Sequence, residues 1–213
     1  MIIVLTGGIG SGKSQVCRIL SEDYGFHVYE ADARVKELYN THPELLSRIE
    51  VALGASFRNA EGDFVPSSLA QVIFCDANAL KTVESLVFPV LIDDFNTWMS
   101  GITDDLPVIF ESATVLEKPQ FSGFGDLIVL VNAPYSIRLA RAGVRDGDSA
   151  KVESRMGFQK LMNRLSEGES DPRIDYVIDN SGSIDELKAK IKDFVLELGK
   201  KQKCYLYRTM MLN

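Results

Sequence analysis

Residues 7–14 read Gly-Gly-Ile-Gly-Ser-Gly-Lys-Ser, directly after the apolar run of residues 1–5. This segment matches the pattern G-x-x-x-x-G-K-[ST] in the context that the pattern requires, a short buried strand before it and a helix-forming segment after it. Glycines allow turns in which successive N–H groups point at phosphate oxygens, and the following helix adds the positive end of its dipole. Such turns also occur without a ligand, but the position and the Lys-Ser pair favour a nucleoside triphosphate site.

Two side chains of this loop have expected roles. The Lys13 ammonium can reach the β- and γ-phosphates, and the Ser14 hydroxyl can ligate Mg²⁺ that keeps most of its waters. The residues predicted to bind the nucleotide are Gly8, Ile9, Gly10, Ser11, Gly12, Lys13, Ser14 and Gln15. The loop therefore predicts a nucleotide and a metal ion, but not yet a reaction.

The composition limits the class of protein. The 213 residues, 46% hydrophobic and 25% charged, suffice for one core domain with inserted subdomains. The net charge of −7 argues against a nucleic-acid-binding surface. No apolar run approaches the ~18 residues of a membrane span, and the N-terminus lacks the basic start of a signal peptide. We expect a cytoplasmic protein with neither a nucleic-acid nor a membrane partner.

The cysteines and histidines show no metal-binding pattern. Cys17, Cys75 and Cys204 are widely spaced and form no C-x-x-C pair. Cys17 falls inside the first predicted helix and Cys75 in an apolar segment, so we expect buried free thiols rather than ligands or nucleophiles. His27 and His42 also lack metal-ligand spacing. Metal chemistry through thiols or imidazoles is therefore not expected.

Alternating helix and strand signals predict an open parallel sheet. After the first strand, the patterns predict a helix over 13–24. Further strands are predicted over 26–29, 106–110, 126–131 and 174–179. A last helix is predicted over about 183–198, and it starts with a Ser183–Glu186 capping box. The intervening segment is mostly helical, with helices over 33–39 and 43–53, from residue 66, and over 78–100 with Pro89 as a kink or break. About five parallel strands with right-handed crossovers give a three-layer α/β fold, and the inserted helices suit a substrate-binding subdomain.

Two carboxylates follow predicted strands. Asp32 comes at the carboxyl end of the second strand, where ligands gather in open parallel sheets. It could orient a substrate hydroxyl or accept its proton, or it could be the N-cap of the next helix. Glu111 ends the third strand and could hold a magnesium-bound water, cap a helix or face solvent. Spacing alone does not decide between these roles.

Basic residues are spread over positions 138–164 of this acidic chain. Arg138, Arg141 and Arg145 stand at i, i+3 and i+7 and therefore share one helix face. A cationic stripe of this kind favours a lid that closes on transferring phosphates. The alternative is a solvated face paired with the acidic residues at 146, 148 and 153.

Several motifs occur in one order along nearly the whole chain. They are LTGGIGSGKS at 5–14, EAD at 30–32, Phe-Pro at 88–89, a block ending at Glu117, RAGVRD at 141–146, RMGFQ at 155–159 and VIDNSG at 177–182. In this order and spacing the chain resembles the dephospho-CoA kinase family. The resemblance implies a P-loop kinase that uses ATP and Mg²⁺ and phosphorylates the ribose 3′-hydroxyl of dephospho-CoA, the last step of coenzyme A synthesis.

The resemblance also implies roles for residues and segments. Asp32 would be the base or hydroxyl-orienting group, and the catalytic set would be completed by Lys13, Arg141 and Arg145. Ser14 would bind Mg²⁺ directly, and Glu111 would do so through water. The domains would be a nucleotide-binding core at about 1–32, 105–137 and 172–199, an inserted helical acceptor-binding subdomain at 33–104, and a lid at 138–171.

Some positions depart from the family pattern. Glu30, Phe88, Pro66, Gln15 and Ala113 stand where the family usually has Asp, His, Arg, Thr and Pro, respectively. Phe88 and Pro66 fall in the half expected to bind the acceptor, so acceptor identity is less well specified than ATP use. The alternatives are a nucleoside or nucleotide monophosphate kinase on the same scaffold and a non-catalytic ATP-binding switch. We expect a monomer or weak homo-oligomer. The sequence leaves the role of residues 200–213 open, since Tyr205, Leu206 and Tyr207 could pack on the domain or bind a neighbouring molecule.

Overall fold

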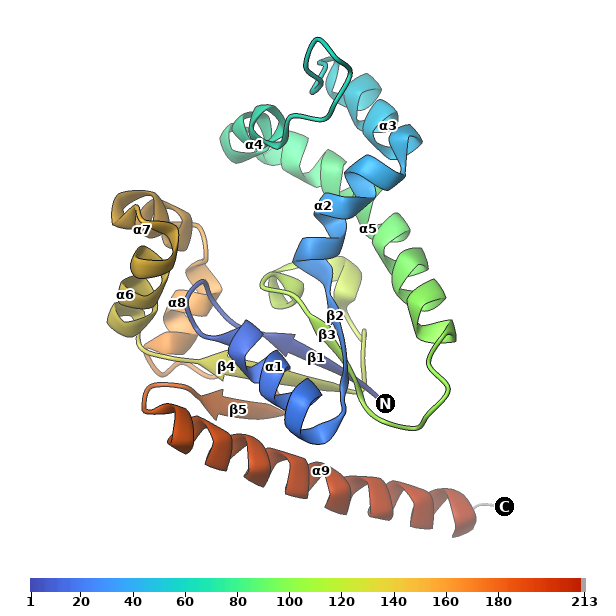
Figure 1. The fold of residues 1–213 in the computed structure, drawn as a ribbon, viewed down its shortest axis with the longest axis vertical. Helices are drawn as coiled ribbons and strands as arrows, with labels where there is room; N and C mark the ends of the chain where they lie inside the picture. Colours follow the sequence, from blue (N-terminus) through green and yellow to red (C-terminus); the bar gives the residue numbers. More distant parts are fainter. Residues whose placement is uncertain (212–213) are drawn as a thin grey trace. The chain divides into compact units, whose positions relative to one another are not determined.

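The computed structural model describes residues 1–211, with side chains described for residues 1–200. The chain forms two compact units (Figure 1). Unit 1 contains Met1–Val28 and Asp105–Asn213, and unit 2 contains Tyr29–Asp104.

A five-stranded sheet has the order β2-β3-β1-β4-β5. Its strands are β1 (Ile2–Thr6), β2 (His27–Glu30), β3 (Val108–Glu111), β4 (Leu127–Asn132) and β5 (Tyr176–Asp179). Strand β1 pairs in parallel with β3 and β4, and β4 pairs in parallel with β5. Because these strands are parallel, the segments that follow β1, β3, β4 and β5 all leave the same edge of the sheet.

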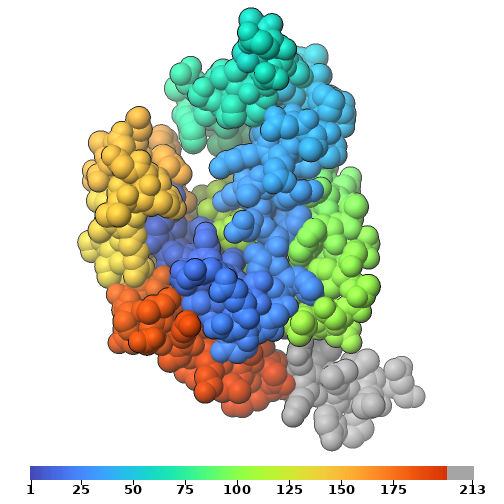
Figure 2. Space-filling model, viewed as in Figure 1, coloured from blue at the N-terminus to red at the C-terminus, as the bar shows by residue number. Residues whose placement is uncertain are grey.

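Both faces of the sheet in unit 1 are covered, which gives the predicted three layers. Strand β4 shows this by its alternation, because Val129 and Val131 pack into one core and Leu130 into another. The first core joins the sheet to α1 (Lys13–Tyr24) and α9 (Ile184–Met211). The second joins it to the short helix η1 (Val115–Glu117) and to α8 (Lys160–Ser166). Helices α1 and α9 lie side by side on the surface of this unit (Figure 2).

The remaining elements of unit 1 are η2 (Pro119–Phe121), α6 (Tyr135–Asp146) and α7 (Ser149–Gly157). Local signals define two helix ends as predicted. Helix α1 ends at Gly25, whose φ of 74° is in the left-handed region that favours glycine. Helix α9 starts with a capping box, because the Ser183 amide donates to Glu186 Oε2 and the Glu186 amide donates to Ser183 Oγ.

Unit 2 begins with the last two residues of β2, and the rest of it is helical apart from loops and an isolated bridge between Arg58 and Phe64. Its helices are α2 (Ala31–Thr41), α3 (Pro43–Leu53), α4 (Pro66–Cys75) and α5 (Ala77–Ser100). Helix α5 packs against the other three, and its buried row of Val83, Val87, Leu91 and Phe95 recurs every four residues. The core of this unit therefore runs along one face of α5.

The structure corrects several expectations. Pro89 does not break its helix, because α5 continues through it with buried residues on both sides. Cys75 is exposed, since it is the last residue of α4, whereas Cys17 is buried as predicted. The last helix does not end near Leu198 but continues to Met211. The Cys204 side chain lies outside the described residues.

Candidate active site

The loop between β1 and α1 is built on glycine conformations. Gly10 and Gly12 have φ values of 77° and 94°, which favour glycine. Gly12 also caps α1 without a side-chain hydrogen bond, and its carbonyl accepts from the amides of Gln15 and Val16, so the amides of Lys13 and Ser14 are the ones without a partner within the helix. Their N–H groups and the helix dipole form a site for an anion at the carboxyl edge of the sheet.

Lys13 lies back along this loop. Its Nζ atom donates to the carbonyl of Gly7 at 3.0 Å and lies 3.4 Å from Glu111 Oε1. The two charged side chains are only 12% and 9% exposed. Leu5 is the register partner of Glu111, so the pairing of β1 with β3 brings this carboxylate to the loop. The structure thus places together two of the predicted site residues, and Glu111 is not a solvent-facing charge.

Hydroxyl groups of the loop, and that of Thr6 at the end of β1, could contact a polar ligand. Ser14 is exposed in the first turn of α1. Ser11 Oγ and Thr6 Oγ1 are buried and have no hydrogen-bond partner among the described residues. Buried hydroxyls normally find a partner, so these two atoms fit a loop that is completed by a polar ligand or water.

Two polar residues that sequence reasoning did not single out hold the loop in place. The Gln159 side chain accepts a hydrogen bond from the amide of Ile9 at 2.8 Å, and the Asn180 side chain donates to the carbonyl of Ser11 at 2.8 Å. Asn180 packs so closely that a Cβ on Gly12 would lie 2.1 Å from its Nδ2 atom. Both residues belong to motifs of the resemblance, at 155–159 and 177–182, which were the available signal.

The three arginines of α6 have different environments, so they do not form one cationic stripe. Arg138 is 1% exposed and lies under the loop. Arg141 donates to the carbonyl of Asn180 at 2.8 Å. Arg145 is 61% exposed and pairs with Asp146 at 2.6 Å, which raises the pKa of Arg145 and lowers that of Asp146. For Arg145, the alternative of a solvated ion pair describes the observed contacts.

Asp32 belongs to unit 2, where it is exposed in the first turn of α2. It is not the N-cap, since helix α2 begins earlier than predicted and Glu30 occupies that position. Asp94 on α5 binds one residue before Asp32 and one residue after it. Its carboxylate accepts from the Tyr29 hydroxyl at 2.6 Å and from two Arg34 nitrogens at 2.6 and 2.8 Å. The backbone that carries Asp32 is therefore fixed by a charge-assisted network.

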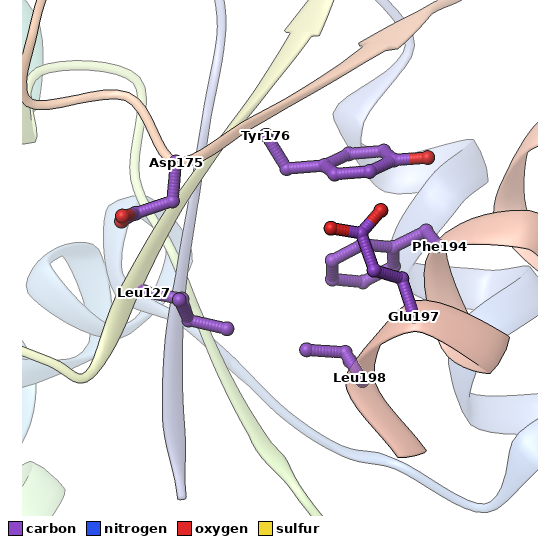
Figure 3. A pocket seen from close by; sticks show the side chains of 6 residues that line it. All are labelled: Leu127, Asp175, Tyr176, Phe194, Glu197 and Leu198. Carbon is purple, nitrogen blue, oxygen red and sulfur yellow. The ribbon is translucent and has the colours of Figure 1, made fainter. Parts of the chain in front are cut away.

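A pocket of unit 1 lies at the opposite edge of the sheet (Figure 3). It is lined by Leu127, Asp175, Tyr176, Phe194, Glu197 and Leu198. Leu127 and Tyr176 begin β4 and β5, and the Tyr176 and Phe194 rings lie 4.9 Å apart. Apolar side chains and two acidic residues do not suit a phosphate, so this pocket is not part of the candidate active site.

Comparison with known proteins decides the family. The family model for dephospho-CoA kinase matches residues 1–186. The chain belongs to the dephospho-CoA kinase family. The dephospho-CoA kinase of Aquifex aeolicus is 30% identical over 196 residues, which cover 92% of this chain and 96% of that protein. The enzyme of Porphyromonas gingivalis is 37% identical over 170 residues, which cover 79% of this chain and 82% of that protein.

Solved structures agree with this fold. A crystal structure of a protein from Thermus thermophilus matches with a TM-score of 0.77 and 28% identity, covering 93% of this chain and 97% of that one. Dephospho-CoA kinase from Campylobacter jejuni matches with a TM-score of 0.54 and 19% identity, covering 92% and 96%. The predicted family, α/β P-loop kinase fold and ATP-dependent phosphotransferase class are confirmed.

Other predictions concern metal, membrane and location. Within the described residues, no three His, Cys, Asp or Glu side chains are placed to hold a metal ion together. No helix in the part of the chain that the structure describes combines the length and the apolar character of a membrane span. The cytoplasmic location, the oligomeric state and the roles of individual site residues stay predictions.

Proposed function

We propose that this protein transfers the γ-phosphoryl group of ATP to the ribose 3′-hydroxyl of dephospho-CoA, giving coenzyme A and ADP. The observation that carries the assignment of roles is the loop of residues 7–14 in a chain of this family, with Lys13 held between Gly7 and Glu111. Backbone amides of the loop and the Lys13 ammonium would bind the β- and γ-phosphates. The reaction would then depend on positioning and on neutralising charge.

The acceptor would be held by the helical subdomain at 33–104. Asp32 would orient the 3′-hydroxyl for in-line attack and take its proton as the new P–O bond forms and the bond to ADP breaks. An exposed carboxylate on a turn fastened by Asp94 supports this role. Arg141 and Arg145 would close as part of a lid at 138–171, and Arg145 would then exchange Asp146 for a phosphate oxygen.

Magnesium is implied by the loop pattern, and the residues present fit it. The exposed Ser14 hydroxyl and the Glu111 carboxylate are hard oxygen ligands at the same edge of the sheet, which Mg²⁺ prefers. With so few protein ligands, the ion would keep waters and bind phosphate oxygens, and it would reduce the negative charge of the nucleotide. Ser14 would hold it directly and Glu111 through water.

The test is ADP production from ATP and Mg²⁺ with dephospho-CoA, compared with a panel of nucleosides and nucleotides as acceptors. We expect turnover with dephospho-CoA alone and coenzyme A as the product, identified by mass. Turnover only with a nucleoside or nucleotide would retain the kinase and overturn the acceptor. ATP binding without turnover on any acceptor would favour a non-catalytic switch.

A further inference from the structure

Arg138 is a buried cation whose partners are all neutral. The side chain is 1% exposed and is the largest of the fully buried side chains in the described part of the chain. Its Nη2 atom donates to Asn163 Oδ1, its Nη1 atom lies 3.5 Å from the carbonyl of Met162, and its Cζ atom lies 5.8 Å from the centre of the Tyr135 ring. Its Nε atom has no partner among the described residues.

The guanidinium lies directly against the loop of residues 7–14. A Cβ on Gly8 would lie 1.8 Å from Arg138 Nη1, and one on Gly10 would lie 2.1 Å from the Arg138 carbonyl oxygen. The guanidinium is therefore next to the backbone of the loop, and the amides of such a loop bind phosphates. A guanidinium stays protonated even when burial lowers its pKa, as it does for Arg138.

A buried charge without a counter-charge is unfavourable for the folded protein. The same charge becomes favourable when an anion binds nearby, because Coulomb attraction is strong away from bulk water. The loop is the place in this unit where such an anion is expected. The burial that destabilises the free protein would thus also strengthen the binding of an anion in the loop.

We propose that Arg138 is the counter-charge of the polyphosphate, uncompensated in the free protein and compensated when a nucleoside triphosphate binds in the loop. Arg138 acts across the loop backbone and is a positioning residue, not a catalytic one. The inference rests on the proposed function only in that the loop must bind ATP.

The experiment compares ATP binding and ligand-free stability in three variants. Arg138→Gln removes the charge but keeps hydrogen-bonding capacity, Arg138→Lys keeps the charge, and Arg48→Gln removes a charge from an exposed side chain on α3, outside the loop and the predicted lid. Calorimetric titration gives the Kd for ATP and ADP, and thermal unfolding without ligand gives the stability. We expect Arg138→Gln to weaken ATP binding by roughly tenfold or more, and to weaken ADP binding less.

The stability measurement separates the counter-charge from a structural role. Arg138→Gln should leave the ligand-free unfolding temperature unchanged or higher, Arg138→Lys should keep most of the ATP affinity, and Arg48→Gln should change neither quantity. A structural role predicts the opposite, a lower ligand-free unfolding temperature in both Arg138 variants and no rescue of affinity by lysine, and this result would overturn the proposal.

The remaining outcomes are also decisive. Wild-type protein that binds ATP, with Arg138→Gln binding it equally well, would overturn this proposal alone. Wild-type protein that binds neither ATP nor ADP would overturn the proposed function and this proposal with it. If Arg138→Gln does not fold, Arg138→Lys decides, because retained affinity supports the counter-charge and lost affinity contradicts it.

Discussion

The ammonium of Lys13 is positioned by contacts with the phosphate loop and with β3. Lys13 lies against the carbonyl of Gly7 and the carboxylate of Glu111, so its ammonium is held at the loop before any phosphate arrives. Because both side chains are nearly buried, an incoming phosphate would compete with Glu111 for a poorly hydrated cation. Holding the ammonium in advance reduces the side-chain entropy that binding would otherwise cost.

The first prediction at this scale concerns Asp32. We expect Asp32→Asn to keep its affinity for ATP and to lower kcat with dephospho-CoA by about 10²–10⁴-fold, the range for a lost general base. Steady-state turnover and calorimetric ATP binding measure the two quantities. The matched control is Asp63→Asn, an exposed aspartate in the loop between α3 and α4 of the same unit, which should leave both unchanged. Undiminished turnover in Asp32→Asn would remove Asp32 from the mechanism.

The second prediction concerns Asp94, whose pKa is lowered chiefly by its hydrogen bonds from Arg34. We expect Asp94→Asn to lower the free energy of unfolding at pH 7 by about 1–2 kcal/mol, a discounted value because the Arg34 side chain is 40% exposed. A lowered carboxyl pKa gives stability that is present above the unfolded-state value of about 3.9 and is lost as pH falls through the folded-state value.

Urea unfolding between pH 3 and pH 8 tests the sign of this effect. The difference between wild type and Asp94→Asn should be constant above about pH 5 and should shrink below about pH 4. The neighbouring Asp93 is exposed, and Asp93→Asn is the control expected to change little at any pH. A difference that grows as the pH falls would contradict the assigned direction of the pKa shift.

At the scale of elements, the turn between β5 and α9 ties separate segments to the loop. The Asn180 side chain donates to the carbonyl of Ser11, its amide donates to the carbonyl of Asn132, and its carbonyl accepts from Arg141. One residue thus connects the phosphate loop, the end of β4 and Arg141 of the predicted lid. A substitution in this turn should therefore weaken the binding of the nucleotide.

Asn180→Ala tests this connection. It leaves the carbonyl of the buried Ser11 without this donor, so we expect the KM for ATP to rise about tenfold and the free energy of unfolding to fall by about 1–3 kcal/mol. Initial rates and urea unfolding measure both. Ser181→Ala, at the exposed neighbouring position, should behave as wild type. An unchanged KM would show that the loop keeps its geometry without Asn180.

Local sequence signals predicted where helices begin and end, but they could not predict which side chains tertiary packing would bury. The glycine at 25 and the pair Ser183–Glu186 act on backbone groups within a few residues of themselves, so the end of α1 and the start of α9 could be predicted from sequence. The spacing of the α6 arginines predicts that they share one face of the helix. It does not predict that the loop of residues 7–14 buries Arg138 while Arg145 stays exposed. The contact of Arg138 with Gly8 joins segments 130 residues apart, and no local pattern records such a contact.

For the whole molecule, the division into two compact units separates the proposed tasks. Unit 1 carries the phosphate loop, Glu111 and the arginines of α6, whereas unit 2 carries Asp32 and the four helices expected to bind the acceptor. Each unit has its own buried core, with the sheet in one and the α5 row in the other. Each ligand should therefore stabilise chiefly the unit that binds it, by mass action.

Hydrogen exchange with each ligand alone tests this division. We expect ADP to slow exchange of amides at 7–16 and in the turn after β5, while amides of 33–104 change little. Dephospho-CoA should slow exchange mainly within 33–104, with its adenosine end adding protection near Asp32. Because the protection reports local opening, it distinguishes binding by one unit from general stabilisation, which would slow exchange throughout the cores. Protection by dephospho-CoA confined to unit 1 would contradict the acceptor-binding role of the helical unit and, with it, the assignment of Asp32.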